Sequence, residues 1–134
     1  MNFRVPKLNP PLASEAEDTV SAGPSDTGLP TAIKIIPGNP VHRPRIKVAL
    51  NPIDRFSVSG DAAYIPFGEA PGSFGKPRPR RAGGLLPSEA LLRQLHDFIE
   101  LNRADLFAFD RDPDQSGISG AELMRRLRKL PPKR

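Results

Sequence analysis

Apolar and polar residues alternate along the middle of the chain, with turn residues at short intervals. In the clearest stretch, Ile46 and Val48 fall on the opposite face of an extended chain from Lys47. A period of two is typical of strands with one buried face. Pro66 has no amide to donate, which places the last strand at a sheet edge. The pattern predicts an antiparallel β-meander over 31–67, with strands at 31–36, 45–50, 55–59 and 63–67.

After residue 87 the period changes to three and four, which is typical of an amphipathic helix. Ser88 is a favourable N-cap, and no proline follows until Pro113. A second helix is predicted to begin after Ser119, because Glu122 completes a capping box, and to end before Pro131. The apolar stripe of the first helix consists of Leu92, Leu95, Ile99, Leu106 and Phe109.

These elements predict an α+β fold: a small antiparallel β-meander packed by a long helix, plus a second short C-terminal helix. We expect residues 31–130 to form one domain. Residues 1–30 are rich in Pro, Ser and Gly and poor in large apolar residues. They are predicted to be a disordered arm, or one that orders on a partner. Between the meander and the helices, 68–86 reads as a basic Gly/Pro loop, and 87–134 as a helical hairpin with a basic tail.

Asn102 occupies the one polar position on the stripe of the long helix. A polar side chain there costs stability unless it is hydrogen-bonded. Two interpretations remain open for it. Asn102 either fixes the register against a partner helix or lies where the stripe frays and faces water.

Composition narrows the class of protein. The chain has 134 residues, 17 of them proline, and no cysteine. The absence of cysteine excludes disulfides, thiolate metal sites and thiol catalysis. The first eleven residues contain no apolar signal-peptide core, and no apolar run is long enough to cross a membrane. We therefore expect a cytoplasmic protein that makes no membrane contact.

The formal net charge is +5, and residues 31–86 hold nine basic residues against three acidic ones. Such clusters neutralise phosphates or dock on acidic proteins. Aromatic residues make up only 6% of the chain, and no stacking platform or DNA-reading helix is visible. The choice between nucleic acid and an acidic protein surface therefore stays open. The predicted contact residues are Lys76, Arg78, Arg80, Arg81, Arg125, Arg126, Arg128 and Lys129.

Catalytic motifs are lacking. The chain has no phosphate-binding Walker loop, no dinucleotide glycine fingerprint, no nucleophile elbow and no His-Glu metal pair. Its two histidines are His42 in a Pro-rich segment and His96 on the flank of the long helix. A hydrolase that uses His96 would need a pocket with an adjacent nucleophile. We expect a binding protein with no catalytic residues rather than an enzyme.

The acidic connection between the helices resembles the calcium loop of the EF-hand family. That family places oxygen ligands at loop positions 1, 3, 5 and 12, with glycine near 6. Counted from Asp110, the glutamate arrives one residue late; counted from Asp112, it arrives one residue early. A calcium-responsive helical hairpin is therefore the alternative function, with calcium as its cofactor. Its ligands would be Asp110, Asp112, Asp114 and Glu122.

The C-terminal half resembles a group of small bacterial proteins of unassigned function, often carried near mobile elements and toxin–antitoxin operons. The matching runs are FIELNRADL at 98–106 and RLRKL at 126–130. The resemblance covers about 45 residues and no catalytic motif. It implies a small sheet followed by helices, in a bacterial or phage setting. The sequence thus predicts a non-enzymatic accessory protein of a bacterial or phage assembly.

Overall fold

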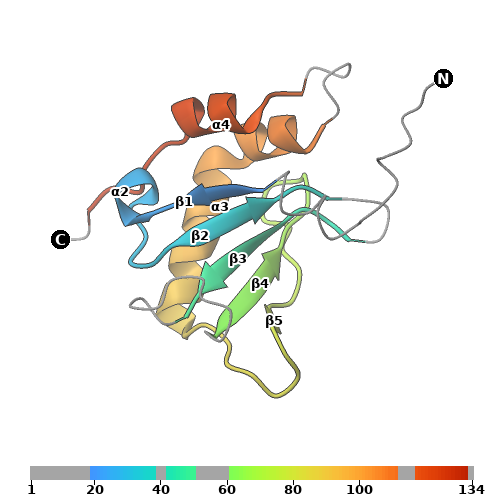
Figure 1. Cartoon of the computed structure of the whole chain (residues 1–134), viewed down its shortest axis with the longest axis vertical. Helices are drawn as coiled ribbons and strands as arrows, with labels where there is room; N and C mark the ends of the chain where they lie inside the picture. Colours follow the sequence, from blue (N-terminus) through green and yellow to red (C-terminus); the bar gives the residue numbers. More distant parts are fainter. Residues whose placement is uncertain (1–18, 39–41, 51–60, 112–116, 133–134) are drawn as a thin grey trace.

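A computed structural model describes residues 19–38, 42–50, 61–111 and 117–132. These residues form a five-stranded antiparallel sheet with helices packed on one side (Figure 1). The predicted α+β fold is confirmed. The strands lie side by side in chain order: β1 (Val20–Ala22), β2 (Ile33–Ile36), β3 (Arg45–Ala49), β4 (Ala62–Pro66) and β5 (Arg78–Pro79). The helices are α2 (Pro24–Thr27), α3 (Glu89–Asp110) and α4 (Gly120–Arg126).

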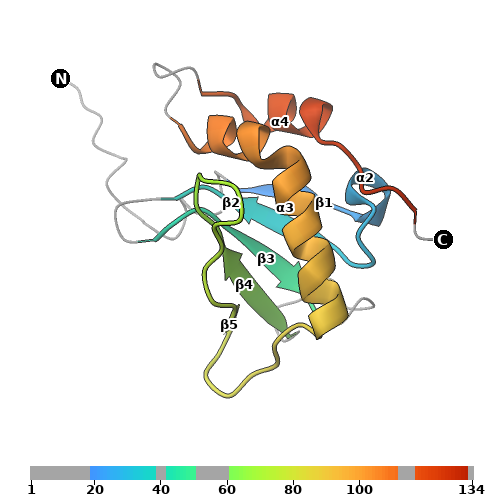
Figure 2. The ribbon, with the colours of Figure 1, turned by 180° about the vertical axis from the view of Figure 1, so that it is seen from behind.

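The strand register gives the sheet one apolar face. Ile35 pairs with Ile46, which pairs in turn with Ile65, so β-branched side chains line up across three strands. The long helix α3 crosses this face (Figure 2) and buries Phe98 and Leu106 against it. Burial of this apolar area is the main favourable term in folding. The core therefore lies between α3 and one side of the sheet.

Both predicted helix caps form. The Ser88 hydroxyl accepts a hydrogen bond from the Leu91 amide at 3.1 Å, and Ser119 accepts one from Glu122 at 3.1 Å. The second helix, however, ends at Arg126 rather than continuing to residue 130. The backbone of Arg128 is bonded to a side chain of α3 instead of to its own helix. This tertiary contact explains the early end.

That side chain is Asn102, which is 1% exposed. Its amide nitrogen donates to the carbonyl oxygens of Phe98 and Arg128, both at 3.1 Å, and its oxygen accepts from the Arg128 amide at 2.7 Å. The Leu130 amide then donates to the Thr27 carbonyl at 2.8 Å. Asn102 therefore neither faces water nor needs a partner helix. It fastens residues 127–130, which we call the C-terminal strap.

The predicted N-terminal arm is too long at its C-terminal end. Val20 is buried and pairs with Ile35, so β1 is an integral strand of the sheet. The helix α4 packs on β1 so closely that a Cβ on Gly120 would lie 2.8 Å from Val20. Sequence patterning missed β1 because the strand has only three residues, and because α4, which packs on it, is about a hundred positions away. Residues 1–18 lie outside the described residues.

Two other expectations need comment. The strand with Pro66 is not the edge strand, because β5 pairs beyond it. This pairing joins only Ala63 and Tyr64 to β5. Pro66 therefore lies past the end of the β4–β5 ladder, where its missing amide removes no hydrogen bond between these two strands. The segment 68–86, predicted as a loop, therefore contributes β5 to the sheet. The predicted strand at 55–59 falls outside the described residues.

Candidate functional site: a basic face of the sheet

The sheet face opposite α3 is lined by basic residues. The register pairs Lys34 with Lys47, Lys47 with Tyr64, and Tyr64 with Arg78, which makes one continuous row across four strands. Lys34, Lys47 and Tyr64 are each one position away from a core residue, so their side chains point to the opposite face, and Arg78 joins them there as the cross-strand partner of Tyr64. Figure 1 looks onto this side of the sheet, with α3 behind it. We call this row, together with Arg45 beside it, the basic face.

Tyr64 is the aromatic residue of the basic face. The guanidinium carbon of Arg45 lies 5.3 Å from its ring centroid, and the ammonium nitrogen of Lys47 lies 5.8 Å from it. Both distances are within the range of cation–π attraction. The ring is half-buried and held between two strands. The face therefore combines a flat aromatic surface with a concentration of positive charge.

Beside Tyr64 the surface is hollowed, with a volume of about 670 Å³. Strand β4 forms its floor with Tyr64 and Pro66. On the β3 side it is lined by Arg43 and Arg45. The segment that leads into β5 supplies the other wall, and no acidic residue is among the described lining residues. The basic lining residues of that wall are Lys76, Arg78 and Arg80.

The local sequence of this wall, KPRPR, explains its arrangement. A residue before proline is driven into extended conformations, which applies to Lys76 and Arg78. In an extended chain, residues two apart project to the same side. The prolines therefore favour an extended run in which Lys76 and Arg78 project to the same side, and both line the hollow together with Arg80.

Part of this wall is fastened to α3. Phe74 also lines the hollow, and its ring stacks on His96 with centroids 3.8 Å apart. Glu100 accepts a hydrogen bond from the Gly72 amide at 2.6 Å and forms an ion pair with Arg103 at 2.8 Å. These contacts hold the segment between β4 and β5 against the helix. The hollow is thus bounded by a supported wall.

His96 has a packing role in this arrangement. Burial lowers its pKa below the usual value, against the opposing fields of Asp97 and Glu100. The stacking of its imidazole on Phe74 is the environment of a structural side chain. The other histidine, His42, lines the hollow on its exposed rim.

The structure separates the basic residues that the sequence analysis grouped together. Lys76, Arg78 and Arg80 line the hollow, whereas Arg81 is exposed and forms an ion pair with Asp61 at 3.6 Å. The sequence analysis did not select Arg43 or Arg45. The alternation that places Arg45 on the face opposite Ile46 was visible in the sequence. Only the tertiary structure shows that Arg45, and Arg43 before the start of β3, face the KPRPR segment.

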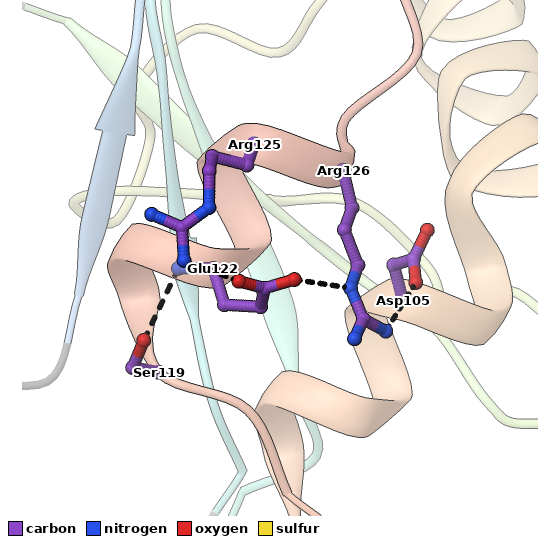
Figure 3. A network of polar contacts seen from close by, with 5 residues as sticks. All are labelled: Asp105, Ser119, Glu122, Arg125 and Arg126. Atoms are coloured by element: carbon purple, nitrogen blue, oxygen red, sulfur yellow. Dashed lines mark hydrogen bonds and ion pairs between the residues drawn. The ribbon is translucent and has the colours of Figure 1, made fainter.

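The C-terminal arginines form a different arrangement, shown in Figure 3. Arg125 is hydrogen-bonded to Glu122, and Arg126 contacts Glu122 at 2.8 Å and Asp105 at 3.4 Å. The hydrogen bonds from Arg126 and Arg125 lower the pKa of Glu122, which keeps it ionised. Arg126 therefore ties α4 to α3 through Asp105, whereas Arg125 is paired within α4, and the charge of both arginines is offset locally.

The two predicted clusters do not form one surface. Helix α4 and strand β5 lie at opposite ends of the molecule in both views (Figures 1 and 2). Arg128 and Lys129 are exposed on the C-terminal strap, at the end away from the hollow. Of the predicted contact residues, three therefore belong to the concave basic site.

The predicted calcium ligands are placed only in part. Asp110 accepts a hydrogen bond from the Gly38 amide, and Glu122 is engaged by two arginines. Asp112 and Asp114 lie outside the described residues. Within the described ranges, no three His, Asp or Glu side chains gather into a metal-binding group.

No family model, curated protein or solved structure matches this chain. Within the part of the chain that the structure describes, none of the helices is both long and apolar enough to cross a bilayer.

Proposed function

We propose that this protein binds single-stranded nucleic acid through the basic face and catalyses no reaction. The observation that carries the proposal is the row Lys34–Lys47–Tyr64–Arg78 across adjacent strands. Single-strand-binding surfaces combine cations that follow the phosphate backbone with aromatic rings on which bases stack. This row supplies both.

The dimensions of the row suit a single strand. Adjacent strands lie about 4.8 Å apart, so β2 and β5 are separated by roughly 14 Å. Successive phosphates of a stacked strand are about 3.4 Å apart along its axis. The row therefore spans about four nucleotides, so its three cations contact phosphates of one strand on either side of the base that Tyr64 receives.

Tyr64 favours nucleic acid over an acidic protein as the partner. Acidic side chains would be attracted by the lysines and arginines alone. An aromatic ring held between cations adds a surface on which a planar base gains stacking energy, about 1–3 kcal/mol. The resemblance of the C-terminal half adds the setting: an accessory protein of a bacterial or phage assembly, working in the cytoplasm.

The test is binding of a fluorescent twelve-nucleotide uridine strand at several salt concentrations. We compare wild type with Lys34→Gln/Lys47→Gln/Arg78→Gln. Each phosphate contact in a single strand contributes about 0.7 to the salt slope. The triple variant should therefore bind at least tenfold more weakly at low salt, with a slope smaller by about 2.

The matched control is Arg93→Gln/Arg128→Gln/Lys129→Gln, which removes the same charge from exposed positions away from the basic face. It should keep most of the affinity and the salt slope. An equal loss in both variants would mean that binding follows net charge and would contradict the proposal. Equally tight binding of an oligoglutamate peptide by the wild type would instead make an acidic protein the partner.

A further inference from the structure

The hollow beside Tyr64 differs from the rest of the basic face in shape and in charge density. Along the row, each strand contributes one side chain. In the hollow, five Lys or Arg side chains line one concavity. This inference rests on the proposed function and concerns which nucleotide of the strand the hollow receives.

We propose that the hollow binds the terminal nucleotide of a single strand and recognises its terminal phosphate monoester. A volume of about 670 Å³ lies within the range of sites that enclose one small molecule, roughly 300–1,000 Å³. One nucleotide fits such a space, whereas a duplex does not enter it. The size therefore selects a single unpaired nucleotide.

The charge of the hollow selects the end of the strand. An internal phosphodiester carries one negative charge, whereas a phosphate monoester carries about 1.5 to 2 at pH 7 and has three terminal oxygens. Guanidinium groups bind such oxygens in pairs, and bonds between charged groups are stronger than neutral ones. Two arginines on one wall face three basic residues on the other across the floor, so a single phosphate group receives hydrogen-bond donors from both walls. The two walls carry Arg43 and Arg45, and Lys76, Arg78 and Arg80.

The position of Tyr64 completes the site. Its ring belongs both to the row and to the lining of the hollow. A terminal base on this ring places its phosphate among the arginines, and the rest of the strand continues over Lys47 toward Lys34. The wall that carries Phe74 is supported by α3, so little ordering is needed on binding.

The experiment compares three eight-nucleotide uridine strands in competition against a fluorescent strand: one with a 5′-phosphate, one with a 3′-phosphate and one with hydroxyls at both ends. The wild type should prefer one phosphorylated strand to the hydroxyl strand by about tenfold, the effect of one additional charged contact. Which of the two phosphorylated strands wins identifies the end that is bound.

Two double variants separate the hollow from the row. Arg43→Gln/Lys76→Gln changes exposed side chains of the hollow that are not in the row, and Lys34→Gln/Lys47→Gln changes the row outside the hollow. The hollow variant should lose the preference for phosphate, down to about twofold or less, and its loss of affinity for the hydroxyl strand should be smaller than that of the row variant. The row variant should bind every strand more weakly and keep the preference.

Equal binding of all three strands by the wild type would overturn this inference and leave the proposed function standing. A preference that survives in the hollow variant would also overturn it, because the phosphate would then be bound elsewhere. Failure of every strand to bind at low salt would overturn the proposed function and this inference with it.

Discussion

Replacing Asn102 with leucine tests how the C-terminal strap is held. Leucine has the same branched outline as asparagine, so Asn102→Leu changes hydrogen bonding more than packing. The substitution removes three hydrogen bonds, two of which satisfy the amide and carbonyl of Arg128. Those two backbone groups are part-buried, and each loses its Asn102 partner.

The expected loss follows from the cost of unsatisfied groups. A buried donor or acceptor without a partner costs about 1–3 kcal/mol. Partial access of water to Arg128 lowers this figure, so the free energy of unfolding should decrease by about 2–4 kcal/mol in total. That is a large share of the roughly 5–15 kcal/mol that stabilises a typical domain.

Urea unfolding followed by circular dichroism measures this difference. The control is Arg128→Ala, which leaves the backbone in place and truncates an exposed side chain; it should change stability by less than about 0.5 kcal/mol. If the strap alone detaches in Asn102→Leu, the m-value should fall, because less surface then remains to be exposed. Wild-type stability and m-value in this variant would refute the reasoning.

Three further predictions concern other parts of the fold. Gly28→Ala should lower the melting temperature, because φ is +81° there and a Cβ would lie 2.6 Å from the Leu130 carbonyl oxygen. We expect the free energy of unfolding to fall by at least about 1 kcal/mol, and an unchanged melting temperature would contradict this prediction. Burial lowers the pKa of His96, so below about pH 6.5 the unfolded chain binds more protons and stability falls as the pH decreases. Urea titrations at pH 7.5 and 5.5 should show a smaller difference for His96→Gln than for wild type, and an identical difference would count against this role. Ser119→Ala removes the cap of α4 and should lower the free energy of unfolding by about 1 kcal/mol, with faster hydrogen exchange at the Glu122 amide. Unaltered exchange at this amide would show that the cap does not stabilise α4.

The basic site was partly predictable. The KPRPR segment stands out by composition, and the extended geometry that proline imposes is a local effect that sequence alone carries. The opposite wall of the hollow was not predictable from the sequence in this way. Arg43 and Arg45 are about 35 positions away, and only the pairing of β3 with β4 and of β4 with β5 brings them across Tyr64.

The amino-acid sequence by itself determined the periodic elements of this protein: the long helix with its Ser88 cap, the start of the second helix at Ser119 and the strands at 33–36, 45–49 and 62–66. These elements depend on the spacing of apolar side chains and on cap hydrogen bonds between residues three positions apart, both of which are local in the sequence.

Tertiary structure alone decided the features whose stabilising contacts lie far away in sequence. Strand β1 is held by β2 and α4, and the strap is held by Asn102, 26 residues from its partner Arg128. The basic face likewise exists only because four strands align one side chain each, and no local pattern specifies that register.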